Sequence, residues 1–423
     1  MNSASTRQQY RLLLPLMLFE ILLIAATLPL WSGSSSFPAI PLLKLFVAIP
    51  SGADAILTFL LVLNCTATFF LVLLSNGHSP QTSTSKIIAA LTFALLTGGT
   101  LVLLNQHRLQ PWHWLFLVLS LQCLILRPER QEFSQRLTIA SIYIFAGLSR
   151  LGPEIDSGMS REVLTNLLSQ SGLTTAIRNQ QLMTFGCIGM TLTEILAGVL
   201  LLAPKWRRAG VILAMTAHVI LLIALGPWGL NHNNAVLIWN IFFIVAVPLL
   251  FWKKPTPATL ASEAPIASPS ESWMALTMNC CIVAFPLLGL IGISDNWPSW
   301  QLYSPRPEVV RLFVSQNAVP LLPEQISEYI DDPPPLQPWC PIRMDRWSLE
   351  ATRSPIYPED RFQLGVVAAI LPDTIADGDF RIMIESAAEP AWWRRTTREI
   401  SSVKELDELR ATMFFSSAVR LPN

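Results

Sequence analysis

Three ionisable side chains lie deep inside long apolar stretches of the sequence, and these are the residues best placed to do chemistry. Glu20, Glu194 and His218 each lie nine residues from one polar end of their own stretch. If the stretches are helices, each side chain lies roughly 13–14 Å from the same membrane surface at a rise of about 1.5 Å per residue. An ionisable group at that depth is costly and usually has a partner and a function. We therefore predict a midplane cluster that handles protons.

Glu194 and His218 are the pair expected to meet. They lie on consecutive apolar stretches joined by the short turn PKWRR, so antiparallel helices would bring them to one level. A carboxylate beside an imidazole stabilises the imidazolium and fixes its tautomer, which is the usual arrangement for proton transfer. The alternative is structural, with Glu194 protonated or hydrogen-bonded to Thr191 or Thr193.

Two polar turns supply a second candidate site. They are NQHRLQPWHW (105–114) and PWGLNHNN (227–234), and both are predicted on the outer side of the membrane. They would jointly form the rim of a ligand-binding mouth, with Arg150, His107, Arg108, Asn231, His232 and Asn234 as its binding residues. The alternative is that their amides only cap helix ends. A metal site needs three ligands at defined geometry, and the spacing of the histidines does not favour one, so none is predicted.

The apolar stretches indicate a membrane protein. Of 423 residues, 52% are hydrophobic and 14% are charged, and the mean hydropathy is +0.45. Soluble domains carry nearer a quarter of charged residues. The sequence has neither phosphate-cradling glycine loops nor basic nucleic-acid patches, so the lipid bilayer is the expected partner and nucleic acid is not. Stretches of this length predict about nine helical spans, at roughly 12–31, 54–75, 86–105, 112–127, 137–152, 181–203, 209–226, 235–252 and 273–293.

The positions of the cations predict the orientation. With the N-terminus in the cytoplasm, inner segments hold eleven Lys and Arg and outer loops hold five, as the positive-inside rule requires. This places the protein in the plasma (inner) membrane with residues 294–423 outside the cytoplasm. Residues 1–293 hold 16 Lys and Arg against 10 Asp and Glu, whereas residues 294–423 hold 13 against 19. The change of sign marks a domain boundary near residue 294.

The predicted organisation is a transmembrane bundle at 1–252, a cytoplasmic linker at 253–272, a last span at 273–293 and an α+β domain at 294–423. In the last domain, EVVRLFV (308–314), LGVVAAILP (364–372) and FRIMIES (380–386) have the composition of strands. LPEQISEYI (322–330) and SVKELDELRATMFF (402–415) have helical spacing. The outer loop at 152–180 contains VLTNLLSQSGL, which predicts a short helix at the membrane interface.

Several motifs together resemble the horizontally transferred transmembrane (HTTM) family, which includes the vitamin K-dependent gamma-glutamyl carboxylase. They are YIFAGLSRL (Tyr143–Leu151) followed by DSGM, NQHRLQPW, the His218 stretch running into GPWG, and WPSWQLYSPRP (Trp297–Pro307). The layout is also similar to DoxX/MauE-like membrane proteins. The resemblance implies a multi-span bundle with an extracytoplasmic C-terminal domain. It covers roughly residues 10–310.

The resemblance also implies where the carboxylase chemistry would lie. In the carboxylase the segment similar to YIFAGLSRL carries lysines, one of which is the base that starts hydroquinone oxygenation. The matching positions here are Ser149 and Arg150. Arginine stays protonated at any accessible pH, so Arg150 cannot be that base, although it could bind an anion or a quinone oxygen. This departure argues against carboxylation itself.

Two functions from different classes remain open, and they predict different behaviour. The first is a non-catalytic anchor that presents the outer domain to an extracytoplasmic protein partner. The second is a membrane redox or lipid-modifying enzyme that holds a quinone-like ligand, with Glu194 and His218 moving protons and Arg150 meeting the ligand. A transporter would be expected to show inverted repeats, and no clear internal repeat is present. The sequence favours the anchor.

Overall fold

The computed structural model describes residues 10–75, 80–156, 158–252, 269–388 and 394–420. Its contacts divide the chain into two compact units. Unit 1 comprises Met1–Leu23, Val62–Leu95 and Pro111–Pro305, and unit 2 comprises Ile24–Leu61, Leu96–Gln110 and Arg306–Asn423. Most of the predicted cytoplasmic linker, with Lys253 and Lys254, lies outside the described residues, as does Arg7.

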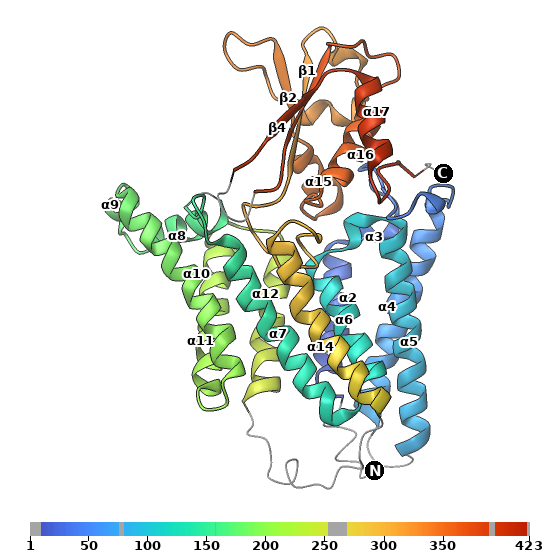
Figure 1. The fold of residues 1–423 in the computed structure, drawn as a ribbon, viewed down its shortest axis with the longest axis vertical. Coiled ribbons are helices and arrows are strands. Elements are labelled where there is room, and N and C mark those ends of the chain that lie inside the picture. The colour runs from blue at the N-terminus through green and yellow to red at the C-terminus, as the bar shows by residue number, and fades with distance from the viewer. Residues whose placement is uncertain (1–9, 76–79, 157, 253–268, 389–393, 421–423) are drawn as a thin grey trace. The chain divides into compact units, whose positions relative to one another are not determined.

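Unit 1 is helical. It contains most of the first long helix, the middle of the chain and the last long helix. Its elements (Figure 1) are α2 (Leu13–Ala26), α6 (Pro111–Ile125), α7 (Pro128–Arg150), α8 (Met159–Gln170), α9 (Thr174–Ile177), α10 (Gln180–Leu202), α11 (Arg207–Leu225), α12 (Asn234–Phe251) and α14 (Pro269–Leu290). Two further helices, α4 (Gly52–Leu74) and α5 (Pro80–Leu104), have residues in both units.

Eight of the nine predicted spans each fall on a single helix, and six helices among the described residues are long and apolar enough to cross a membrane. These six are Gly52–Leu74, Thr84–Leu104, Gln180–Leu202, Arg207–Leu225, Asn234–Phe251 and Ser272–Leu290. The first predicted span is instead two helices, α2 and α3 (Leu28–Ser32). They separate at Thr27 because Pro29 has no amide hydrogen with which to continue the ladder of α2. Helix α6 is apolar but has only 15 residues.

Small residues let the helices of unit 1 approach closely. A Cβ added to Gly198 of α10 would lie 2.7 Å from Cγ1 of Ile144 and 2.9 Å from the carbonyl oxygen of Ala140, both on α7. A Cβ added to Gly210 of α11 would lie 2.7 Å from the backbone nitrogen of Leu201 on α10. Close backbone contact of this kind is typical of helices packed within a membrane.

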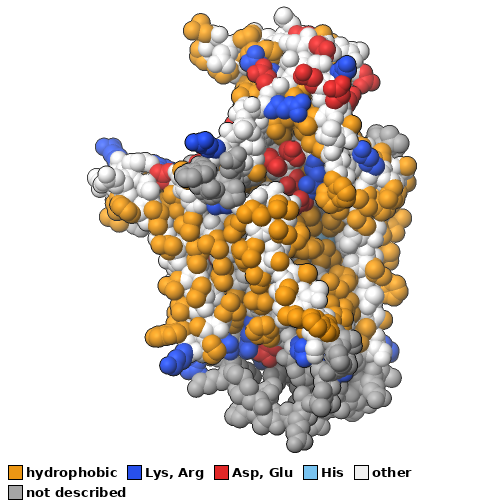
Figure 2. Space-filling view, in the orientation of Figure 1, with side chains coloured by type: hydrophobic (Ala, Val, Ile, Leu, Met, Phe, Trp, Pro, Cys, Tyr) orange, Lys and Arg blue, Asp and Glu red, His pale blue; other side chains and the backbone are white. Residues whose placement is uncertain are grey.

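The outward side chains of these helices are apolar. In Figure 2 hydrophobic side chains cover the visible sides of the helices. On α10 and α11 the exposed large hydrophobic side chains are Leu182, Phe185, Leu192, Leu196, Val199, Ile212, Val219, Ile220 and Ile223. A soluble protein rarely exposes apolar surface on this scale, whereas a lipid-facing helix does. The chain therefore has the surface of a membrane protein.

Unit 2 is built around a four-stranded antiparallel sheet. Its strands are β1 (Val309–Ser315), β2 (Trp339–Ile342), β3 (Phe380–Glu385) and β4 (Thr397–Ile400), in the order β2-β1-β3-β4. Leu312 is opposite Ile342 on one side and Ile382 on the other, and all three are buried. Unit 2 also contains α15 (Met344–Thr352), α16 (Asp360–Ile370), α17 (Val403–Thr412) and the 3-10 helices Lys44–Phe46, Gln106–Arg108, Val319–Leu321 and Glu324–Tyr329.

The prediction of a strand at 364–372 is wrong, because this segment forms most of α16. The helix is buried on more than one side: the backbone amide of Val310 in β1 donates to Oε1 of Gln363, and a Cβ on Gly365 would lie 2.8 Å from the carbonyl oxygen of Ser417. A helix covered on several sides is apolar all round. The periodicity of apolar residues alone does not distinguish such a helix from a buried strand. The strands predicted at 308–314 and 380–386 and the helix at 402–415 are confirmed, and 322–330 contains a 3-10 helix.

The division between the units falls at Pro305, later than the predicted boundary near residue 294. Several hydrogen bonds keep the intervening segment with the helices, among them those from the hydroxyls of Ser294 and Ser299 to the carbonyl oxygen of Phe285 in α14. The indole Nε1 of Trp114 in α6 donates to the carbonyl oxygen of Pro298, at 3.1 Å. The hydroxyl of Ser304 donates to the carbonyl oxygen of Ser149 at the end of α7, at 2.9 Å.

Candidate functional site

Glu20 and His113 form a buried pair in unit 1. Nδ1 of His113, in the first turn of α6, lies 2.6 Å from Oε1 of Glu20 in α2, and the two side chains are 0% and 2% exposed. The imidazole stacks on Phe116 with ring centroids 5.6 Å apart. A carboxylate and an imidazole at hydrogen-bond distance can exchange a proton, so the pair can hold or pass one. The sequence identified Glu20 but not this partner.

His218 is held by two hydrogen bonds that fix its tautomer. Nδ2 of Asn240 donates to the carbonyl oxygen of Val236, which turns Oδ1 of Asn240 toward Nδ1 of His218, 2.8 Å away. Nδ1 must therefore carry the proton, and Nε2 accepts from the hydroxyl of Tyr143 at 2.7 Å. The ring also stacks on Phe243, with centroids 4.9 Å apart. Both ring nitrogens are thus satisfied by neutral groups.

Glu194 pairs with Arg150, and the expected pairing with His218 is replaced. Nη2 of Arg150 forms an ion pair with Oε2 of Glu194, and Nε of Arg150 donates to the carbonyl oxygen of Ala146 at 3.0 Å. The reason is the close contact of α7 and α10, which places the end of α7 beside Glu194. A permanently charged guanidinium is also a stronger partner for a carboxylate than an imidazole is.

Tyr303 lies beside this ion pair, on the segment that follows α14. Tyr303 as a residue is 47% exposed; desolvation of its hydroxyl raises the pKa of that group to about 12, and the positive charge of Arg150 opposes the rise. Tyr303 therefore stays protonated at neutral pH. Its φ of +54° is uncommon for a residue other than glycine.

The predicted outer rim draws on both units, and each turn has its own structure. In unit 1, the backbone amide of His232 donates to the carbonyl oxygen of Leu225 at 2.8 Å, and Asn231 has a φ of +49°. Asn234 begins α12, whose N-cap is Asn233, with its side-chain oxygen accepting from the amide of Ala235. This turn therefore shows the capping that the sequence left as an alternative to ligand binding.

In unit 2, His107 and Arg108 are buried rather than exposed at a rim. Nε2 of His107 lies 2.8 Å from the carbonyl oxygen of Pro355 and so carries the proton, while Nδ1 is buried and has no hydrogen-bond partner among the described residues. The ring lies between Phe37 and Phe362. Burial lowers the pKa of His107 to about 4, the Pro355 carbonyl opposes the shift, and the charge of Arg108 adds to it. His107 is neutral at pH 7.

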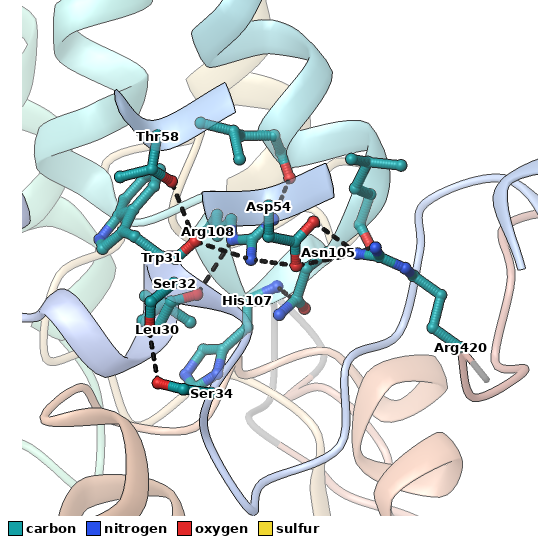
Figure 3. A network of polar contacts seen from close by, with 12 residues as sticks. Leu30, Trp31, Ser32, Ser34, Asp54, Thr58, Asn105, His107, Arg108 and Arg420 are labelled. Carbon is teal, nitrogen blue, oxygen red and sulfur yellow. Dashed lines mark hydrogen bonds and ion pairs between the residues drawn. The ribbon is translucent and has the colours of Figure 1, made fainter. Parts of the chain in front are cut away.

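Arg108 belongs to a buried cluster in which one carboxylate lies between two guanidinium groups (Figure 3). Oδ2 of Asp54 is 2.6 Å from Nη2 of Arg108, and Oδ1 of Asp54 is 2.9 Å from Nη1 of Arg420. All three side chains are 1% exposed. The cluster carries one positive charge in excess, which burial makes costly unless further acceptors are present.

Backbone carbonyls at helix ends and in the loop before α4 supply those acceptors. Arg108 donates to Leu30 and Trp31 at the end of α3 and to Leu101 in the last turn of α5. Arg420 donates to Ile49, Pro50 and Leu104, the last residue of α5. Helix C-termini favour cations and N-termini favour anions. Asp54 is in the first turn of α4, so every charge in the cluster has the sign that its helix end prefers.

Sequence reasoning identified Arg108 but missed Asp54 and Arg420. One signal was present: Asp54 is the sole acidic residue between Glu20 and Glu129, at the start of a 23-residue apolar helix. Its partner Arg420 lies 366 residues away, and nothing in the local sequence distinguishes it from other arginines. The partners His113, Tyr143 and Asn240 were missed because each depends on which helices are neighbours.

Among the described residues, no group of three or more His, Cys, Asp and Glu side chains could hold a metal ion. Comparisons of the chain with models of known protein families, with curated proteins and with solved structures gave no match. What the structure itself defines is a membrane protein with six helices that are able to span a bilayer and a small C-terminal sheet.

Proposed function

We propose that this chain is an HTTM-like multi-pass membrane protein, with nine spans and a cytoplasmic N-terminus, that acts as a non-catalytic anchor. It carries the α+β unit on the extracytoplasmic side of the plasma (inner) membrane and offers it to a protein partner there. The HTTM resemblance and the positive-inside pattern both support this orientation.

The observation that carries the proposal is the Asp54–Arg108–Arg420 cluster. Unit 2 includes the start of α4 and the end of α5, two of the helices able to span a membrane, together with the sheet. Arg420, three residues from the C-terminus, is bonded to both of these helix ends. The cluster thus holds the start of α4 and the end of α5 in the same compact unit as the sheet, through a contact that is buried from solvent. An anchor needs such a connection between the domain that it presents and its membrane helices.

The arrangement of the other polar side chains agrees with a structural role. Both nitrogens of His218 are occupied by neutral partners, and Glu194 is neutralised by Arg150. Polar groups within a membrane are expected to pair in this way when they serve packing.

The orientation is tested with reporter fusions in a bacterial host. Alkaline phosphatase is active only outside the cytoplasm, and green fluorescent protein fluoresces only inside it. We expect a fusion after Asn423 to be active with phosphatase and dark with the fluorescent protein. A fusion within the predicted linker, after Leu260, should show the opposite pattern and serves as the control. Fluorescence from the fusion after Asn423 would refute the proposed placement.

The Glu20–His113 pair favours a second function, a redox or lipid-modifying enzyme with a quinone-like ligand. A proton shared between two fully buried groups is a common feature of sites that couple proton transfer to chemistry. The test is mass spectrometry of small molecules that co-purify in mild detergent, for wild type and Glu20→Gln. The matched control is Glu132→Gln, since Glu132 forms a half-exposed ion pair with Arg136. A stoichiometric apolar cofactor lost only in Glu20→Gln would replace the anchor by the enzyme, and ligand-free wild type would support the anchor.

A further inference from the structure

Unit 2 exposes two apolar segments that the sheet does not use. Leu45, in the 3-10 helix Lys44–Phe46, is 69% exposed, and Phe414, two residues after the end of α17, is 90% exposed. A single exposed apolar side chain is ordinary on a folded unit, so the position of these two side chains is more informative than their exposure. Leu42–Phe46 and Met413–Phe415 together are called the collar below.

Hydrogen bonds join the two segments of the collar. The backbone amide of Ser416 donates to the carbonyl oxygen of Leu42 at 3.0 Å, and that of Arg420 donates to the carbonyl oxygen of Ala39 at 2.9 Å. The buried side chain of Gln106 holds both chains, because its Nε2 donates to the carbonyl oxygens of Pro41 and Ser416. The exposed apolar side chains therefore belong to one fixed surface.

The collar lies level with the ends of two helices that can span a membrane. Gln106 follows directly on the end of α5, and Arg420 is bonded both to Asp54 in the first turn of α4 and to the carbonyl oxygen of Leu104 at the end of α5. The segment that holds Leu45 also leads into α4, which begins at Gly52. If α4 and α5 cross a bilayer, residues at this level meet its headgroup region.

We propose that the collar is a membrane-contacting surface that inserts Leu45 and Phe414 at the boundary between lipid headgroups and acyl chains. Exposed apolar and aromatic side chains at the end of a span are stable at that boundary, where they lie about 5–10 Å deep. The inference rests on the proposed membrane anchor, because it requires α4 and α5 to be spans. It adds that unit 2 touches the bilayer through its own surface as well as through its helices.

The charges near the collar indicate a zwitterionic bilayer. Lys44 is exposed within the collar, and α17, which leads to Phe414, exposes the carboxylates of Glu405, Asp407 and Glu408. Asp407 and Glu408 form ion pairs with Arg410 and Lys404 of the same helix, so the charges near the collar balance and give no net attraction to an anionic surface. Insertion is therefore driven by apolar contact and should not require anionic lipid.

The experiment measures the depth of spin labels on the intact protein in phosphatidylcholine nanodiscs. Cys280 and Cys281 are the exposed thiols, and the other four cysteines are buried, so the background is Cys280→Ser/Cys281→Ser. Nitroxide labels are placed at Leu45→Cys and Phe414→Cys, and power saturation compares contact with oxygen, which enriches in lipid, and with a water-soluble nickel chelate. The matched control is Leu336→Cys, because Leu336 is fully exposed in the loop before β2.

Labels at Leu45 and Phe414 should be accessible to oxygen and shielded from nickel, whereas the label at Leu336 should be accessible to nickel. The ratio should not change when a quarter of the lipid is replaced by phosphatidylglycerol. Nickel accessibility at Leu45 and Phe414 equal to that at Leu336 would overturn the inference. So would labels shielded from both reagents, since that result indicates a second protein copy on the surface.

A label at Phe59→Cys separates this inference from the proposed anchor. Phe59 is exposed on α4, one to two turns inside the span. If the label at Phe59 is accessible to oxygen while the labels in the collar are accessible to nickel, only the inference about the collar fails. If the label at Phe59 is also accessible to nickel, α4 does not span the membrane and the proposed anchor function fails.

Discussion

Replacing Asp54 should destabilise unit 2 more than replacing Arg420, although Arg420 makes more hydrogen bonds. Asp54→Asn keeps the shape of the side chain and removes its charge. It leaves two guanidinium groups in a site where the side chains are 1% exposed, with no anion between them. Arg420→Met leaves Asp54 and Arg108 as a neutral pair at 2.6 Å.

The magnitudes follow from the charge balance. Removing one partner of a buried ion pair costs about 3–5 kcal/mol, and Asp54→Asn should reach the upper part of this range because two cations are left. Arg420→Met restores neutrality but removes donors from the carbonyls of Ile49, Pro50 and Leu104. Part of that loss is recovered through the apolar stem, so we expect about 2–3 kcal/mol. The double variant should be less destabilised than the sum, because only Arg108 remains without an anion.

The assay is hydrogen–deuterium exchange of the protein in detergent, followed by mass spectrometry of peptides from β1 and β3. Exchange of these central strands reports the free energy of opening unit 2. The control is Glu399→Gln, which removes the half-exposed partner of Arg381 and should change that free energy by less than about 1 kcal/mol. The reasoning is refuted if Arg420→Met costs more than Asp54→Asn, or if both fall within the range of the control.

Three further predictions concern single positions. As pH falls from 6.5 to 4, unit 2 should lose about 3 kcal/mol of stability. The pKa of His107 is about 4 when folded and 6.5 when unfolded, and each unit of difference corresponds to about 1.4 kcal/mol. Acid titration monitored by hydrogen exchange of β1 should show this loss, and His107→Gln should remove it. Gly33→Ala should cost about 1–3 kcal/mol in the same assay, because Gly33 has a φ of +69° and its new Cβ would lie 2.8 Å from the carbonyl oxygen of Ser51. Tyr143→Phe should lower the free energy of unfolding by about 1–3 kcal/mol, because Nε2 of His218 loses its hydrogen-bond donor. A thermal unfolding scan in detergent measures this, and an unchanged midpoint of unfolding would contradict the hydrogen bond between Tyr143 and His218.

The sequence predicted the helices of unit 1 well, because a long apolar stretch has few structural alternatives in a membrane. It predicted which residues are chemically unusual but not which ones meet. Glu194 and His218 have the expected depth along their stretches, yet the partners of Glu194 and His218 come from α7 and α12. Neighbour relations of this kind depend on how the helices pack around glycines such as Gly198, and no local pattern encodes them.

In unit 2 the local pattern was least informative where burial is two-sided or where a strand is short. The segment 364–372 was apolar throughout and proved helical, and β2 contains Pro341, which strand patterns disfavour. Asp54 was visible as a lone acid at the start of an apolar helix, but its role became clear only when the chain brought a residue from the opposite end to it.

The use of arginine at position 420, one of 12 arginines among the 13 cations of residues 294–423, has a physical explanation in this cluster. Arg420 uses all three guanidinium nitrogens to join one carboxylate and three carbonyls that come from two helix ends and the loop between α3 and α4. A planar fork can hold acceptors in fixed, divergent directions, whereas an ammonium is a single point charge that is more strongly hydrated. Arg420→Lys should therefore behave like the loss of the side chain, since lysine would retain the charge while leaving several of these acceptors without a donor.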